Sequence, residues 1–337
     1  MKDNNGNSMY GYFLSETFEE GIKKNEIEFE QHCYDEPSFF MFNNSSNKNE
    51  SISNYIFNPM NDTFSPIPSS PNSFKDSGII IKGKNIYLVN GQLCHNLRGM
   101  LTDHVLSYSI ENCNWETNAF GFHSWTRKHS VILTNPLNSC QAFQIGGING
   151  TDYVTNNLIL YDFNAMQFES LKCFPYDKNL KVTKGSTVMG VNYLFTQSPE
   201  AKYIVWDVRV SFNQSQIGNV AFLNNYQNDY SIAKSNYSIF ITGGTQGSGE
   251  ISDDIYEFDT RTMAFFNGPK MLNKRRKHGS FIFRKKLYVM GGFTDNYDNI
   301  RDINLFDLKT NEWELDTVKM PCFIDCTTSI FNDNYFI

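Results

Sequence analysis

The sequence has 337 residues, a formal net charge of −7 and a hydrophobic fraction of 40%. Aromatic residues make up 15% of the chain, which is ample for a large core of strand-forming side chains. Its apolar runs are no longer than a strand, so we expect no membrane-spanning segment. The first twenty residues lack the pattern of a secretory signal, and we therefore expect a cytoplasmic protein.

The negative charge is concentrated in the first fifty residues. They contain ten acidic and four basic side chains, whereas the rest of the chain is close to neutral. A nearly neutral main domain argues against a nucleic-acid partner, which normally requires a basic face. The seven cysteines are scattered and lack the spacing of a zinc site, so we expect reduced thiols, no metal and no cofactor.

Residues 1–53 show no repeat and are interpreted as an acidic N-terminal extension. The segment Thr17–Glu20 reads as a capping box that opens a short helix through about Glu30. Residues 45–53 are rich in Asn and Ser, which is typical of a linker. The predicted boundary between this extension and the repeat domain therefore lies at 53/54.

An internal repeat with a period of about fifty residues dominates the remaining sequence. Its first feature is an aromatic residue, six intervening residues and a second aromatic, with a polar Asp- or Thr-containing turn between them in the best copies. Each copy predicts an outer β-hairpin, and both aromatics are predicted to be structural residues of the repeat. The five pairs are Phe57/Phe64, Tyr108/Trp115, Tyr161/Phe168, Phe258/Phe265 and Phe306/Trp313.

The second feature is an apolar strand that ends in two glycines. Paired glycines permit positive φ and let a neighbouring backbone approach closely. The three clear copies end at Gly146-Gly147, Gly243-Gly244 and Gly291-Gly292, and degenerate versions end at Asn90-Gly91 and Thr196-Gln197. One more strand lies upstream of each, so each unit is predicted to have four strands.

This order of strands resembles the kelch repeat over roughly residues 51–337. Basic residues that often open the kelch inner strand are also present, in Arg127-Lys128-His129 and Arg276-Lys277-His278. The resemblance implies a β-propeller. We expect six four-stranded blades in residues 54–337, with a ring closed by N-terminal outer strands (54–66) that pair with C-terminal inner strands (326–337). The fourth blade, near Tyr203–Asp207, is irregular, because its second aromatic is displaced to Phe212 or Phe222.

The resemblance implies a protein-binding scaffold or adaptor rather than an enzyme. Loops between blades are free of the constraints of the repeat, so partner contacts are expected there. A basic stretch in one of them is suited to an acidic or phosphorylated peptide, although it also fits a solvated loop. The predicted contacts are Lys274, Arg275, Arg276, Lys277, Thr245, Gln246, Asp295 and Tyr297.

Two alternatives stay open. In one, the acidic extension docks on the basic loop within the same chain, for which opposite charge is the only motive. In the other, the chain is a kelch-propeller enzyme that acts on a sugar and is similar to a sialic-acid mutarotase. Such an enzyme needs an acid/base pair in the central channel, and the sequence alone places none, so no catalytic residue is predicted.

Overall fold

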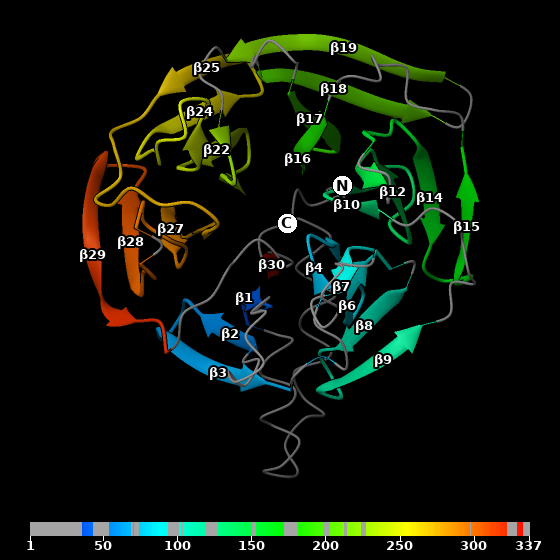
Figure 1. The fold of residues 1–337 in the computed structure, drawn as a ribbon, viewed down its shortest axis with the longest axis horizontal. Coiled ribbons are helices and arrows are strands. Elements are labelled where there is room, and N and C mark those ends of the chain that lie inside the picture. The colour runs from blue at the N-terminus through cyan, green and yellow to red at the C-terminus, as the bar shows by residue number, and fades with distance from the viewer. Residues whose placement is uncertain are drawn as a thin grey trace, which may run out of the picture.

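The computed structural model describes residues 36–42, 54–68, 70, 74–93, 101–102, 104–118, 127–149, 153–171, 181–197, 203–211, 214–223, 227–296, 298–321 and 329–332. This part of the chain is all-β, and it contains no helix long and apolar enough to cross a membrane. The helix predicted from Thr17 to about Glu30 lies outside the described residues. Antiparallel sheets are arranged in a ring, with β30, β4, β10 and β16 near its centre and β3, β9, β15, β19, β25 and β29 at its rim (Figure 1).

Five blades each come from one continuous stretch of chain and consist of four antiparallel strands. We name each blade by its innermost strand. Their strands are β5 (Gly78–Lys82), β6 (Asn85–Val89), β8 (Val105–Ser109) and β9 (Asn114–Asn118); β11 (Val131–Thr134), β12 (Gln141–Ile145), β14 (Leu158–Asp162) and β15 (Gln167–Ser170); β16 (Lys181–Val188), β17 (Val191–Gln197), β18 (Tyr203–Ser211) and β19 (Gln214–Leu223); β21 (Ser231–Lys234), β22 (Ser238–Thr242), β24 (Ile255–Asp259) and β25 (Ala264–Asn267); β26 (Gly279–Phe283), β27 (Lys286–Met290), β28 (Asp302–Asp307) and β29 (Glu312–Lys319).

A further four-stranded sheet, the closing sheet, joins the two ends of the repeat region. From the inside outward it contains β30 (Ser329–Asn332), β1 (Ser38–Met41), β2 (Asn54–Asn58) and β3 (Thr63–Ile67). The register places Phe39 opposite both Phe331 and Phe57. With the five blades it makes six four-stranded sheets among the described residues. Pairing of N-terminal outer strands with a C-terminal inner strand agrees with the prediction.

The composition of the closing sheet nevertheless corrects the predicted boundary at 53/54. Three of its strands come from the N-terminal side and one from the C-terminal side, instead of two from each. The additional strand, β1, lies in the segment assigned to the extension. Its side chains are all buried, because both faces are covered: Phe39 stacks on Phe281 with ring centroids 4.7 Å apart, and Phe40 packs with Ile86 and Leu88. The C-terminal strand predicted at 334–337 lies outside the described residues.

The aromatic repeat marks the outer hairpins as predicted. In all five pairs the two aromatic residues are directly opposite each other in the two outer strands. Their ring centroids are 4.7 to 6.2 Å apart, within the range of favourable aromatic contacts. The sixth hairpin, in the β16 blade, differs because β18 and β19 are longer, and Phe222 is opposite Ile204 rather than an aromatic. Phe212 lies outside the described residues.

The two residues of a pair differ in burial. The first aromatic is buried in every pair, and Tyr108 and Phe258 have no exposed surface. Trp115 and Phe265, the second residues of these pairs, are only partly buried and are not core residues. The reason is that they lie on β9 and β25, the outermost strands, where one edge of the blade meets solvent (Figure 1). Trp115 uses this position to donate its indole N–H to the Pro68 carbonyl at 2.8 Å.

The glycine pairs have the backbone conformation that the sequence predicted. Gly243 and Gly244 have φ of 54° and 100°, and Gly291 and Gly292 have φ of 70° and 87°. A Cβ on Gly292 would lie 2.4 Å from the carbonyl oxygen of Arg276, which is closer than any side chain tolerates. The glycines are therefore required where the chain that follows the second strand of a blade passes against the chain that enters the blade.

Three short two-stranded sheets occur at this crossing. They pair the chain that enters a blade with the chain that follows its second strand. The pairs are β4 (Phe74–Lys75) with β7 (Gln92–Leu93), β10 (Arg127–Lys128) with β13 (Ile148–Asn149), and β20 (Gln227–Asn228) with β23 (Thr245–Gln246). In the β26 blade a single bridge between Arg276 and Phe293 takes their place. These contacts fix the loops on one face of the ring.

Candidate functional site

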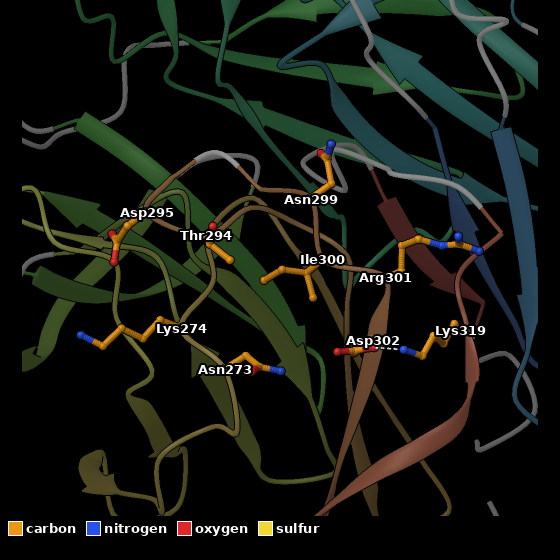
Figure 2. Close-up of a pocket in the computed structure, with 9 residues that line it drawn as sticks. All are labelled: Asn273, Lys274, Thr294, Asp295, Asn299, Ile300, Arg301, Asp302 and Lys319. Atoms are coloured by element: carbon orange, nitrogen blue, oxygen red, sulfur yellow. Dashed lines mark ion pairs between the residues drawn. The ribbon is translucent and has the colours of Figure 1, made fainter.

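A polar pocket opens on this loop face beside the β26 blade (Figure 2). Its volume is about 510 Å³. One wall comes from the loop between β25 and β26, the opposite wall comes from the loop between β27 and β28 and the start of β28, and the last side comes from the end of β29. The lining residues are Asn273, Lys274, Thr294, Asp295, Asn299, Ile300, Arg301, Asp302 and Lys319.

Three cationic and two anionic side chains line the pocket, and the anionic ones are engaged with other groups. Lys319 Nζ lies 3.1 Å from Asp302 Oδ1. The Asp295 carboxylate accepts a hydrogen bond from the backbone N–H of Ile251 at 3.1 Å, which ties two neighbouring loops together. Lys274 is exposed and has no ion pair among the described residues. The excess of positive charge makes the pocket suited to an acidic group.

Two of the predicted partner contacts, Lys274 and Asp295, therefore lie together in one pocket. They are 21 positions apart in the sequence, and the two loops that carry them bring them to the same side of the opening (Figure 2). Their role in partner binding stays a prediction.

Arg275 is not a surface residue, and its prediction as a partner contact is wrong. The side chain is fully buried inside the β26 blade. Its guanidinium donates hydrogen bonds to the backbone carbonyls of Val289, Gly291 and Asp302 at 3.2 to 3.4 Å, and to Asn304 Oδ1 at 2.5 Å. Because these acceptors belong to β27, to β28 and to the glycine pair, Arg275 holds the blade together.

The same arginine recurs in the β11 blade, which also corrects the alignment of the repeat. Arg127 is 1% exposed and donates to the Gly146 carbonyl, as Arg275 does to that of Gly291. Arg127 therefore corresponds to Arg275 and not to Arg276. The sequence alone does not show which residue matches Arg127, because Arg275, Arg276 and Lys277 are three consecutive basic residues and any of them could occupy that position of the repeat.

The remaining predicted contacts lie elsewhere. Arg276 is half-buried and exchanges backbone hydrogen bonds with Phe293. Lys277 has a positive φ of 54°, and its backbone N–H donates to the Asp229 carbonyl at 2.8 Å. Thr245 and Gln246 form β23, where the Gln246 side chain donates to Asp254 Oδ2 at 3.2 Å. Tyr297 lies outside the described residues.

Sequence reasoning missed most of the pocket lining. Asn299 to Asp302 follow directly after the predicted loop, so extending that loop to the next strand would have included them. Lys319 is different, because it ends an outer strand that carries no unusual signal. Only the fold places it beside Asp302 (Figure 2).

Two comparisons with known proteins agree with this architecture. The family model for the kelch motif matches residues 274–315, which span the β26 blade from its buried arginine to its outer strand. A solved structure described as that of YjhT is 13% identical, with a TM-score of 0.63 over 79% of this chain and 91% of that chain. At this identity the likeness concerns the fold alone. No curated protein matches the sequence. The matched motif and the ring of four-stranded sheets support a kelch-repeat β-propeller.

Proposed function

We propose that this protein is a non-catalytic scaffold that binds a protein partner through the loop face beside the β26 blade. The pocket described above carries this proposal. It is open, it is lined mainly by polar and charged side chains, and its two walls are loops held by a rigid blade. Binding residues carried on loops over a rigid framework are the usual arrangement in recognition proteins.

The charges of the pocket favour an acidic or phosphorylated peptide segment. Lys274 lies on one wall and Arg301 with Lys319 on the other (Figure 2). The Lys274 ammonium points away from Arg301, whose Nε donates to the Met320 carbonyl at 2.6 Å, so a bound peptide would meet the cations at separate points. Asp302 already pairs with Lys319, and Asp295 is held by Ile251, which lowers the repulsion that either carboxylate would exert on an acidic ligand. Ile300 supplies an apolar surface for a neighbouring side chain.

The test is binding of a peptide array by the full chain. The array pairs each sequence with versions carrying phosphoserine, aspartate or neutral serine at one position. The test variant is Lys274→Glu with Lys319→Glu, and the matched control is Lys309→Glu, at an exposed turn between β28 and β29. We expect acidic and phosphorylated peptides to bind the wild type and the control, and the double variant to lose them.

A melting temperature unchanged in the double variant shows that charge, not folding, was altered. Equal binding by wild type and double variant, or no preference for acidic peptides, contradicts the proposal.

A further inference from the structure

Lys82 connects two neighbouring blades beside a free cysteine. It ends β5, and its ammonium group donates hydrogen bonds to the Ser139 and Gln141 carbonyls of the β11 blade at 2.8 and 2.9 Å. These two residues flank Cys140, in the turn between β11 and β12. The Lys82 nitrogen is therefore held beside Cys140.

The alternation of side chains along the strands directs Lys82 and Cys140 to the same boundary. Ile80 and Ala142 pack in one cluster between the β5 and β11 blades, which are neighbours in the ring (Figure 1). Lys82 follows Ile80 by two positions and Cys140 precedes Ala142 by two, so both side chains face this boundary. The Cys140 thiol also acts on the charge of Lys82, which agrees with their closeness.

Both groups are open to a small reagent. Lys82 and Cys140 are each partly exposed, and Cys140 is a free thiol. The Asn164 side-chain amide donates a hydrogen bond to Cys140 Sγ at 3.0 Å, so the sulfur has a defined position. The pair therefore combines an amine and a thiol, the two strongest nucleophiles among side chains, at one place on the surface.

The surroundings of Lys82 make its amine reactive. Burial lowers its pKa from 10.5 to about 8, and the Cys140 thiol opposes this shift without cancelling it. At pH 7 roughly one tenth of the amine is then neutral, compared with about one part in three thousand for a lysine of ordinary pKa. Only the neutral amine is a nucleophile, so Lys82 reacts far more readily than an ordinary surface lysine.

We propose that Lys82 and Cys140 form a covalent capture site for a small aldehyde, which joins the thiol to the amine through its carbonyl carbon. The thiol adds to that carbon, and its proton passes to the aldehyde oxygen. The amine then forms a C–N bond to the same carbon, the C–O bond breaks, and the oxygen leaves as water with a proton from the amine. One aldehyde, one thiol and one amine give one bridge and one water, so neither an oxidant nor a reductant is needed.

The position of the two groups favours the bridge over separate adducts, because the second step is intramolecular. A lysine that leaves the Ser139 and Gln141 carbonyls reaches the neighbouring sulfur by rotation of its side chain alone. The site is separate from the peptide pocket of the proposed function, since the two share no residue.

The test treats the folded full chain with ortho-phthalaldehyde, which an amine and a thiol within reach of each other convert to a fluorescent isoindole with loss of two waters. Peptide mapping by mass spectrometry then locates the isoindole. We expect it between Lys82 and Cys140, at a yield at least about tenfold above that at Cys113. Cys113 is the matched control thiol, because it is also free and partly exposed, and it donates to the Ile110 carbonyl at 3.6 Å. Formaldehyde added first should block the isoindole, because it occupies the same pair.

Lys82→Arg keeps a charged donor for the two carbonyls but removes the nucleophilic amine, so it should abolish the isoindole at Cys140 and leave the melting temperature unchanged. Lys84→Arg, at an exposed position of the same turn, should keep it. An absent isoindole, an equal yield after unfolding in urea, or an isoindole that formaldehyde does not block would overturn the proposal. The wild-type mapping decides this even if a variant fails to fold.

Discussion

The buried Arg275 offers the sharpest test of how a blade is held together. Arg275→Met keeps the length and much of the apolar contact of the side chain but removes the guanidinium. Three backbone carbonyls and Asn304 Oδ1 then lose a charged donor in a site that water does not reach. An acceptor left without its donor in the interior costs about 1–3 kcal/mol, and such losses are not additive.

We therefore expect Arg275→Met to lower the free energy of unfolding by about 3–5 kcal/mol, because several buried acceptors lose their donor together. At about 2–4 °C per kcal/mol for a chain of this size, the melting temperature falls by roughly 10 °C. Arg275→Lys should fall in between, because an ammonium group keeps the charge but cannot reach acceptors in several directions.

Thermal unfolding followed by circular dichroism measures the effect. Lys274→Met, at the adjacent exposed position, is the matched control and should stay within about 0.5 kcal/mol of the wild type. If Arg275→Met melts within about 2 °C of the wild type, the guanidinium is not what joins β27 to β28, and the reasoning fails.

Three further predictions follow from the same packing. Gly292→Ala should lower the free energy of unfolding, measured by urea denaturation, by about 2–4 kcal/mol, because its Cβ would lie 2.4 Å from the Arg276 carbonyl oxygen. The control Gly83→Ala has φ of 56° but nothing within 4 Å of its Cβ, so the loss should be about 1 kcal/mol. Equal losses would contradict the close approach at Gly292. Trp313→Ala should lower the free energy of unfolding by about 3 kcal/mol, because it removes the ring contact with Phe306 and the hydrogen bond to the Pro269 carbonyl. Trp313→Phe should lower it by only about 1 kcal/mol. An unchanged melting curve for the alanine variant would disprove this packing role. Hydrogen bonds from Arg261 lower the pKa of Asp259 to about 2, so the ionised carboxylate stabilises the fold above the unfolded pKa of 3.8, and this stabilisation is lost as the pH falls towards 2. The stability of Asp259→Asn should therefore depend less on pH during acid denaturation than that of the wild type. Identical profiles would refute the assignment.

The repeat was visible in the sequence because it depends on local geometry. Aromatic residues seven positions apart, such as Tyr161 and Phe168, face each other across any hairpin with a four-residue turn. A glycine such as Gly244 is required where the backbone has positive φ, whatever the rest of the fold does. Four-stranded blades could therefore be predicted from single stretches of chain.

The burial of the repeat aromatics could not be predicted in the same way. Spacing alone treats Tyr108 and Trp115, or Phe258 and Phe265, as equivalent members of a pair. Burial depends on which strand of the hairpin lies at the rim, and the second strand of each pair is the outermost one. Trp115 and Phe265 are therefore partly buried, whereas their partners are enclosed by the neighbouring blades.

The functional assignments depended on contacts between distant stretches. Arg275 and Lys274 are neighbours with the same charge, yet one is buried beneath the glycine pair and the other faces solvent. The strand pattern of Ser38–Met41 was masked by its acidic and Asn-rich surroundings, and only the partner strand β30 shows why four buried residues occur there.

The sequence by itself determined the repeat, the hairpins and the glycine turns, because each arises from residues close together in the chain. Only the tertiary structure decided which basic residues are available to a ligand, and which residues meet in a site. The pocket needs Lys319 beside Asp302, which depends on the register of β28 with β29 and on the bulge between Asp302 and Asn304. The contact of His129 with Asp76 from the preceding blade depends on how two blades pack round the ring, and no local pattern encodes that packing.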